Sequence, residues 1–273
     1  MNRYTTKTFG LELVMIAATA AFLFPIYVAL MVALKTPHDL AVAPLAPPWP
    51  PAFDNITTVW TQSGIGSGLL GSSFIVVVSV VLQVVVGAPA GYALARRLGR
   101  TSTALYLLFM FGLILPPQLG LIPLFQTVKN LHLLGTYFAL VLVYAGSLLP
   151  FTVFLFTGFI RVLPTEYEYA AFADGASRLQ AFRMVVFPLL RPVIGTVVIL
   201  DAIGVWNDFF TPLLYLGGGT YTTVPLAIYS YVDQYTTQWN LLFAAMLVGI
   251  LPILIAFIIL QRYVIKGFVP SLK

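Results

Sequence analysis

Six apolar stretches, each long enough to cross a lipid bilayer, constrain the fold of this chain more than any other feature of its sequence. A membrane-spanning helix needs about 20 mostly apolar residues. Such stretches cover residues 13–34, 69–95, 103–124, 134–160, 193–216 and 241–260. Hydrophobic residues make up 60% of the chain and charged residues only 8%, unlike a soluble domain. The sequence therefore predicts an all-α integral membrane protein with six transmembrane helices in a single domain, residues 1–273.

The positive charges predict the orientation in the membrane, because cytoplasmic loops carry an excess of Lys and Arg. With six spans, Lys35 and Lys129 fall on one side and all other Lys and Arg residues on the opposite side. The second group consists of Arg3, Lys7, Arg96, Arg97, Arg100, Arg161, Arg178, Arg183, Arg191, Arg262, Lys266 and Lys273. We therefore expect both termini in the cytoplasm and two extracytoplasmic segments, residues 35–67 and 217–240. The basic residues are split among separate sites beside the membrane, which argues against nucleic-acid binding.

The chain offers few residues for redox or metal chemistry. It has no cysteine, which excludes disulfide bonds and thiolate metal sites. Its two histidines, His38 and His132, are far apart in the sequence, and we expect each in an external loop. The chain also lacks the Gly-x-x-x-x-Gly-Lys-Ser/Thr phosphate-binding loop, so it is not expected to hydrolyse ATP. We predict no catalytic residue, no metal site and no cofactor bound by this chain.

A long polar segment, residues 163–190, interrupts the apolar second half of the chain and carries signals for two short helices. Thr165, followed three residues later by Glu168, has the form of a capping box, in which two side chains bond the backbone at the start of a helix. Ser177 and Gln180 repeat this pattern. The segment is therefore predicted to be a structured cytoplasmic loop.

Three small residues add to the interpretation of this loop. Gly175 stands where the first helix would end in a left-handed conformation, which glycine adopts without strain. Ala170 and Ala171 lie on that helix without bulk, so that another backbone can approach closely. We expect the membrane protein to meet a soluble partner here. The alternative is an amphipathic loop that only lies at the membrane surface.

The two outer segments have different compositions. Residues 36–51, TPHDLAVAPLAPPWPP, contain six prolines, which predict an extended, polyproline-like chain over the outer face, as a linker or a docking surface. Residues 217–240 begin with three glycines and continue with many aromatic and hydroxyl side chains. Such a surface suits a sugar or a protein partner, and an aromatic belt at the membrane interface is the alternative.

Two features within the spans predict helix packing and helix breaks. Gly87 and Gly91 form a pair of small residues four positions apart, which typically allows close contact between helices. Pro116 and Pro117 are expected to break the third span, because proline removes a backbone donor and the freed carbonyls need other partners.

Acidic residues in the fifth span suggest a solute path. Asp201 lies about ten residues into this span, where inserting a carboxylate costs roughly 2.5 to 3.5 kcal/mol. Asp208 follows seven residues later and is therefore expected on the same helix face. With Trp206 and Asn207 beside it, Asp208 would give the span a polar and aromatic stripe suited to lining a path. The alternative is a structural role, in which Asp201 only bonds to a neighbouring helix.

The same two carboxylates raise two other functional classes. A membrane-embedded enzyme would need a catalytic pair, but Asp201 and Asp208 would be about 10 Å apart along a helix and lack His or Cys partners. A self-contained, ion-coupled secondary transporter or channel using the same two residues remains the alternative, because intramembrane carboxylates also serve as ion relays. Inverted internal repeats would favour it, and none is recognisable in the sequence.

The segment FADGASRLQAFRMVVFPLLRP resembles the cytoplasmic motif of permease subunits from binding-protein-dependent ABC importers. In that family an Ala-Ala pair, an Asp-Gly pair and a distal Leu-Pro-like element define a coupling helix. The matching residues are Ala170, Ala171, Asp174, Gly175 and Pro188. Where the family motif usually has Glu before the two alanines this chain has Tyr169, with Glu168 one position earlier, and Phe187 replaces the usual Leu.

The resemblance extends over nearly the whole chain. Similar elements are LKTPHDL after the first span, GYALARRLGR after the second, LPPQLGLIPLF in the third, WNDFFTPLLY in the fifth and QRYVIKGFV at the end. Together they are similar to the carbohydrate-importer branch, specifically to the smaller, maltose-permease-G-like partner. The resemblance implies the ABC type I importer permease fold and a location as a multi-pass protein of the bacterial or archaeal cell (inner) membrane.

The resemblance also implies a division of labour between subunits. An extracytoplasmic solute-binding protein would deliver a carbohydrate, two homologous permease subunits would form the path, and a dimer of ATPase subunits would bind ATP and Mg. Residues implied in contact with the ATPase are Glu166, Glu168, Tyr169, Ala170, Ala171, Asp174, Gly175 and Pro188. Residues expected to line this chain's half of the path are Asp201, Trp206, Asn207, Asp208 and Tyr215.

Overall fold

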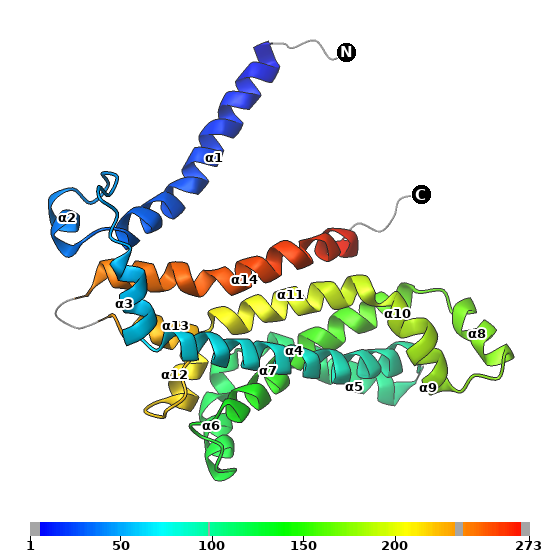
Figure 1. Cartoon of the computed structure of the whole chain (residues 1–273). Coiled ribbons are helices and arrows are strands. Elements are labelled where there is room, and N and C mark those ends of the chain that lie inside the picture. The colour runs from blue at the N-terminus through cyan, green and yellow to red at the C-terminus, as the bar shows by residue number, and fades with distance from the viewer. Residues whose placement is uncertain (1–5, 98, 233–236, 269–273) are drawn as a thin grey trace. The chain divides into compact units, whose positions relative to one another are not determined.

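The computed structural model describes residues 6–97, 99–232 and 237–268, and all regular elements in these ranges are helices (Figure 1). The elements are α1 Thr6–Ala33, α2 Pro37–Val42, α3 Asp54–Gln62, α4 Ile65–Arg96, α5 Arg100–Ile114, η1 Pro117–Gly120, α6 Leu121–Asn130, α7 Tyr137–Val162, α8 Glu166–Ala173, α9 Arg178–Ala181, η2 Phe182–Val186, α10 Phe187–Leu189, α11 Arg191–Asn207, α12 Phe210–Leu216, α13 Val224–Tyr229 and α14 Trp239–Phe268. The expected all-α class is confirmed. The chain divides into unit 1, residues 1–66 and 227–251, and unit 2, residues 67–226 and 252–273.

Some residues used in the sequence predictions lie outside the described part of the structure. These are Arg3, Lys273, the end of QRYVIKGFV, residues 233–236 of the outer segment, and the side chains of Lys7, Arg262 and Lys266.

Among the described residues, four helices are long and apolar enough to cross a membrane by themselves. They are Thr8–Ala33, Ile65–Arg96, Tyr137–Val162 and Trp239–Ile259. Two further candidates are bent pairs, Arg100–Ile114 with Pro117–Asn130 at 99° and Arg178–Leu189 with Arg191–Asn207 at 71°. The structure thus offers four to six spans, and the arrangement of six remains a prediction.

The predicted break at Pro116 and Pro117 is confirmed. Helix α5 ends at Ile114, and Leu115 and Pro116 both have extended backbones, with ψ of 129° and 125°. A residue that precedes proline is pushed out of the helical region by the proline ring, and here two successive residues are in that position. The third predicted span, residues 103–124, is therefore not one straight helix.

The fifth predicted span, residues 193–216, also divides in two. Helix α11 ends at Asn207, and Asp208 has an extended backbone with ψ of 121° before α12 begins. The Asp208 carboxylate accepts hydrogen bonds from the Thr211 backbone N–H at 3.2 Å and from its hydroxyl at 2.5 Å. Aspartate is suited to such a role at the start of a helix. Asp208 therefore follows the last residue of α11 instead of lying inside a continuous span. Its spacing of seven residues from Asp201 still directs both carboxylates toward α7, where they meet Tyr144 and Thr152.

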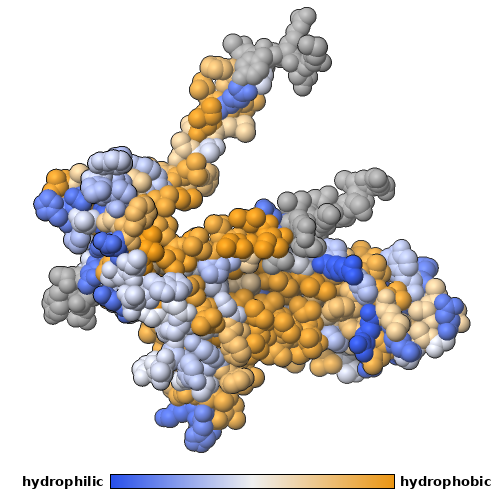
Figure 2. Space-filling model, in the orientation of Figure 1, coloured by the Kyte–Doolittle hydropathy of each residue, from blue (hydrophilic) through white to orange (hydrophobic). Residues whose placement is uncertain are grey.

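In unit 2, α4, α7 and α11 run alongside one another, with α8 and α9 at one end of them (Figure 1). A Cβ atom on Gly87 would lie 2.5 Å from Thr152 Cγ2, and one on Gly91 would lie 2.7 Å from Phe156 Cβ. The predicted close packing at the two glycines is thus confirmed, and α7 is the partner helix. Hydrophobic residues cover the sides of these helices, and hydrophilic residues gather toward α8 and α9 (Figure 2).

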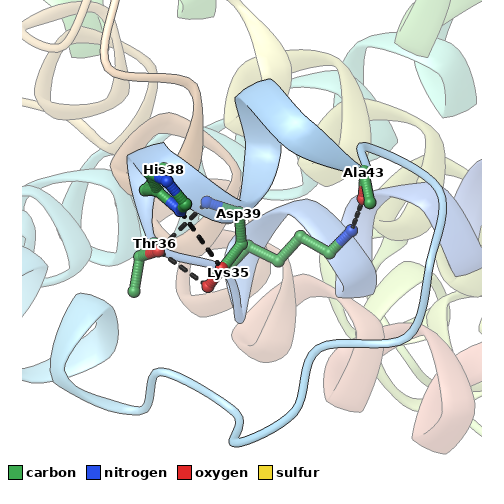
Figure 3. A network of polar contacts seen from close by, with 5 residues as sticks. All are labelled: Lys35, Thr36, His38, Asp39 and Ala43. Carbon is green, nitrogen blue, oxygen red and sulfur yellow. Dashed lines mark hydrogen bonds and ion pairs between the residues drawn. The ribbon is translucent and has the colours of Figure 1, made fainter.

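In unit 1, the proline-rich segment after α1 folds around a buried lysine (Figure 3). The Lys35 ammonium donates hydrogen bonds to the carbonyl of Ala43 and, at 2.9 Å, to that of Pro44. Thr36 caps α2, and Pro37 stands at the start of this helix, where its missing N–H does no harm. The prediction of an extended chain over residues 36–51 is therefore wrong for residues 37–42, which form the helix α2.

The two histidines lie in different local structures. His38 lies in α2 rather than in a loop, and its side chain is 85% exposed. His132 lies in the turn after α6, as expected, with a positive φ of 55°. Beside His38, the Thr36 hydroxyl donates to the Asp39 carboxylate at 2.7 Å and lowers the pKa of Asp39. No group of three potential metal ligands was found among the described residues.

A second polar contact in unit 1 holds the start of α3. The Asn55 side chain is buried and donates to the carbonyls of Ala33 and Lys35, both at 2.8 Å. Its amide oxygen accepts a hydrogen bond from Asn240 at 2.9 Å. Asn55 therefore ties the start of α3 to the end of α1 and to the start of α14.

Candidate functional site

The loop between α7 and α11 contains the helix α8, and its two ends are formed differently. At the start, Thr165 has a helical backbone and no capping hydrogen bond from its side chain, so the predicted capping box with Glu168 is wrong. At the end, Gly175 has a φ of +84°. Its N–H donates to Phe172 and the N–H of Ala176 donates to Ala171, at 3.0 and 2.9 Å. These two bonds form a Schellman motif, which confirms the predicted glycine terminator.

The second helix of the loop begins as predicted. The Ser177 N–H donates to the Gln180 side chain at 2.7 Å, and the Gln180 N–H donates to the Ser177 hydroxyl at 3.4 Å. This reciprocal pair is the complete capping box of α9. Both ends of the turn between α8 and α9 are thus fixed by local hydrogen bonds, which holds the loop in one conformation.

The Glu168 carboxylate is turned inward and pairs with the end of α4. It accepts a hydrogen bond from Arg96 Nε at 2.7 Å and another from the Tyr92 hydroxyl at 2.7 Å. The second guanidinium arm of Arg96 reaches the Leu163 carbonyl at 3.0 Å. The side chains of Arg96 and Glu168 are only 17% and 7% exposed. Charge-assisted bonds of this length are strong, so α4 and α8 are joined by a buried ion pair.

The residues of α8 and of the chain on either side of it divide between two faces. Thr165, Glu168, Tyr169 and Phe172 follow helical spacing and line a cavity of about 620 Å³ together with α4 and α9. Other residues singled out from the sequence are exposed: Glu166, Ala170, Asp174 and Gly175. Ala171 and Pro188 are half-buried. One face of α8 is therefore used within unit 2, and the other is open to a partner.

A buried polar chain crosses the helices of unit 2. Gln83 of α4 donates to the carbonyls of Tyr144 and Ala145 in α7, both at 3.0 Å. Its amide oxygen accepts from the Thr152 hydroxyl at 3.1 Å, and the same hydroxyl lies 3.4 Å from the Asp201 carboxylate. Asp201 is only 2% exposed. The structure therefore places Asp201 against α7, inside the helix packing.

The other residues expected to line a path are not gathered in one stripe. Trp206 and Tyr215 are buried, with exposures of 5% and 3%. Asn207 is exposed and donates to the Ile203 carbonyl at 2.9 Å. Asp208 is half-buried and accepts a hydrogen bond from the Tyr144 hydroxyl at 3.1 Å. Of the five residues, only Asn207 and Asp208 reach a surface of this chain.

Sequence reasoning missed several polar residues that organise these sites, namely Tyr92, Arg96, Gln83 and Thr152. Arg96 was recognised only as a cytoplasmic positive charge. A signal was available for Gln83, because an uncharged polar side chain in the middle of an apolar span needs a partner. For the pairing of Arg96 with Glu168 no local signal exists.

Comparison with known proteins agrees with this architecture. Residues 83–269 match the family described as "Binding-protein-dependent transport system inner membrane component". Over 269 residues the chain is 31% identical to the melibiose/raffinose/stachyose import permease protein MelC of Bacillus subtilis (strain 168), covering 98% of this chain and 97% of MelC. It is 32% identical over 249 residues to the multiple sugar-binding transport system permease protein MsmG of Streptococcus mutans serotype c, covering 90% and 89% of the two chains.

A solved structure shares the fold. It is a bacterial ABC transporter involved in the import of the acidic polysaccharide alginate, and one of its chains superimposes with a TM-score of 0.83 at 20% sequence identity. The match covers 97% of this chain and 100% of the other. The chain therefore belongs to the family of binding-protein-dependent transport system inner membrane components, which are the permease subunits of ABC importers and not their ATP-hydrolysing subunits.

Proposed function

We propose that this chain is one of two permease subunits of an ATP-driven importer of a carbohydrate in a bacterial or archaeal cell membrane. The observation that carries the proposal is the loop of residues 163–190, a rigid element with one face of α8 anchored to α4 and the other exposed. The proposed carbohydrate substrate is supported by the relatives, whose names refer to melibiose, raffinose, stachyose and multiple sugars.

In this proposal the exposed face of α8 enters a groove of a separate ATPase subunit, which binds ATP and Mg. Ala170 lies on that face between Glu166 and Asp174, so the ATPase backbone can approach closely between two charged contacts. When the ATPase subunits close, α8 moves with them. The buried pair of Glu168 and Arg96 then transmits the movement to α4, one of the candidate spans.

The solute path is proposed to lie between this chain and a second, homologous permease, with an extracytoplasmic solute-binding protein delivering the carbohydrate. Asn207 and Asp208 support a contribution from this chain, because both reach its surface where α11 gives way to α12. Asp201 is closed off by Thr152 and contributes only if the helices separate. Family membership favours this proposal over a self-contained ion-coupled transporter that uses Asp201 and Asp208.

Affinity isolation of this chain from native membranes in mild detergent tests the proposal. Mass spectrometry should identify an ATPase subunit, a second permease and a solute-binding protein, and the eluate should hydrolyse ATP in a vanadate-sensitive manner. The recovered binding protein can then be screened against sugars and oligosaccharides. Recovery of the chain alone or as a homo-oligomer, without hydrolysis, would overturn the proposal and lead to ion-flux measurements on Asp201 and Asp208.

A further inference from the structure

The cavity between α8, α9 and the end of α4 has a charge that the coupling role does not use. We propose that it binds the phosphate-bearing headgroup of an anionic phospholipid from the cytoplasmic leaflet. This inference relies on the proposed cytoplasmic orientation of the loop of residues 163–190, but not on the identity of the transported solute.

The first argument is the balance of charges around the cavity. Three arginines line it, Arg96, Arg97 and Arg178, against the single carboxylate of Glu168. Arg96 is already engaged by Glu168 and the Leu163 carbonyl. Arg97 and Arg178 are exposed, and within the described residues neither has a carboxylate partner within ion-pair distance. Two guanidinium groups are thus free to bind an anion, and guanidinium groups match phosphate in charge and geometry.

The second argument is the nature of the walls. Aromatic rings from three elements line the same cavity, and those of Tyr92 and Phe182 pack against each other in a tilted arrangement with centroids 5.0 Å apart. Tyr169 and Phe172 continue this surface along α8, with Leu179 from α9 beside them. A free phosphate ion would gain no binding free energy from contact with these apolar walls. A molecule with a charged head and an apolar body would gain binding free energy from both the arginines and the aromatic rings.

The third argument is location and size. Pro89 and Tyr92 lie near the end of α4, which is one of the apolar candidate spans, so the cavity runs along the end of a proposed transmembrane helix. Basic pockets beside the cytoplasmic ends of transmembrane helices are typical sites for anionic lipid headgroups. A volume of about 620 Å³ also lies in the range of small-molecule sites and accommodates a headgroup with its glycerol unit.

The test uses the complete transporter, purified and reconstituted in nanodiscs of phosphatidylcholine with increasing phosphatidylglycerol. Native mass spectrometry counts retained anionic lipid, and ATP hydrolysis is measured in parallel. The double variant Arg97→Gln/Arg178→Gln should lower the affinity for phosphatidylglycerol about 30-fold, since each arginine near a membrane surface contributes about 1 kcal/mol. Arg100→Gln/Arg183→Gln is the matched control, because it removes the same charge from exposed positions outside the cavity lining.

Each outcome separates the proposal from its competitors. Equal loss of lipid from both double variants would overturn a specific site. If soluble glycerol phosphate bound to the transporter as tightly as phosphatidylglycerol does, the occupant of the cavity would be a small anion rather than a lipid, and the proposal would be wrong. If photo-crosslinks from position 178 reached the ATPase subunit, a protein would fill the cavity and the proposal would be wrong. Absence of any ATPase subunit from the complex would contradict the proposed function instead, and lipid retention would still be measurable.

Discussion

The carboxylate of Glu168 and the guanidinium of Arg96 lie 2.7 Å apart although the two residues are separated by 72 positions in the sequence. One stands in the first turn of α8 and the other is the last residue of α4. An acid near the start of a helix and a base at the end of a helix are each favoured by the helix dipole. The pair is therefore stabilised by its position in both helices as well as by mutual attraction.

Replacing Glu168 by Ala should uncouple the transporter. Removal of one partner leaves Arg96 buried without a counter-charge, which costs roughly 3 to 5 kcal/mol for a buried pair. We expect sugar uptake in cells to be lost while the ATPase subunits still bind, with hydrolysis no longer stimulated by the solute-binding protein. Tyr167→Ala is the control for position, because Tyr167 is exposed in the same helix turn and belongs neither to the cavity lining nor to the proposed ATPase contact.

An exchange of the two charges tests whether the ion pair between Glu168 and Arg96 is responsible for the loss of uptake. The double variant Glu168→Arg/Arg96→Glu should recover part of the uptake that either single variant loses. If the double variant were no better than the two singles, Glu168 would act through some other contact.

Replacing Gly175 by Val should abolish uptake and leave membrane insertion intact. A β-branched residue at a φ of +84° costs about 1 to 2 kcal/mol or more, because its Cβ is close to the neighbouring carbonyl oxygen. The Schellman motif would open and the exposed face of α8 would be misaligned. Asn at this position tolerates the left-handed conformation and should keep most of the activity. Normal uptake by the Val variant, measured at equal membrane abundance, would contradict a coupling role for the loop.

Replacing Gly91 by Ala should destabilise the packing of α4 on α7. The added Cβ would lie 2.7 Å from Phe156 Cβ, and overpacking of this kind costs about 1 to 3 kcal/mol. The matched control is Gly158→Ala on α7, where a Cβ meets no atom within 4 Å. A lower melting temperature of the purified complex for the first variant only is the expected result. Equal melting temperatures would show that the helices separate easily at Gly91.

Replacing Asp208 by Asn should reduce uptake more than assembly. The variant keeps an oxygen acceptor for Thr211 but loses the charge near the exposed Asn207. Asp201→Asn should affect uptake only slightly, since Thr152 is the only hydrogen-bond partner of Asp201 identified among the described residues and Asn can keep this bond. Uptake of labelled sugar, normalised to the amount of assembled complex, distinguishes the two. Failure of assembly in both variants would favour a structural role.

Local patterns in the sequence were sufficient for the long helices α4 and α7 and for the turn between α8 and α9. Apolarity over about 20 residues predicted α4 and α7 to within a few residues, and the cap at Ser177 and the stop at Gly175 depend only on neighbours in the sequence. The pairing of Glu168 was missed for a physical reason. A local cap at Thr165 and a distant arginine compete for the same carboxylate, and burial favours the arginine because a buried charge requires an opposite charge.

The end of α11 was missed for a similar reason. Neither glycine nor proline marks the position after Asn207, and a mostly apolar sequence resumes at Phe209 and continues into α12. The helix stops where Asp208 takes up its bonds with Thr211 and Tyr144, and Tyr144 comes from a distant part of the chain. The polarity of the sequence identified candidate residues for a solute path, but not the end of α11 or the distant partners of these residues.

The cavity beside Glu168 and Arg96 leaves α8 and the end of α4 joined at one polar point rather than along a continuous packed face. Because the loop that carries α8 is held in one conformation, α8 and the loop move together, and a displacement of an attached ATPase subunit would reach α4 through these few polar contacts. The contacts are hydrogen bonds rather than interlocked side chains, so their geometry can adjust when the angle between the two helices changes.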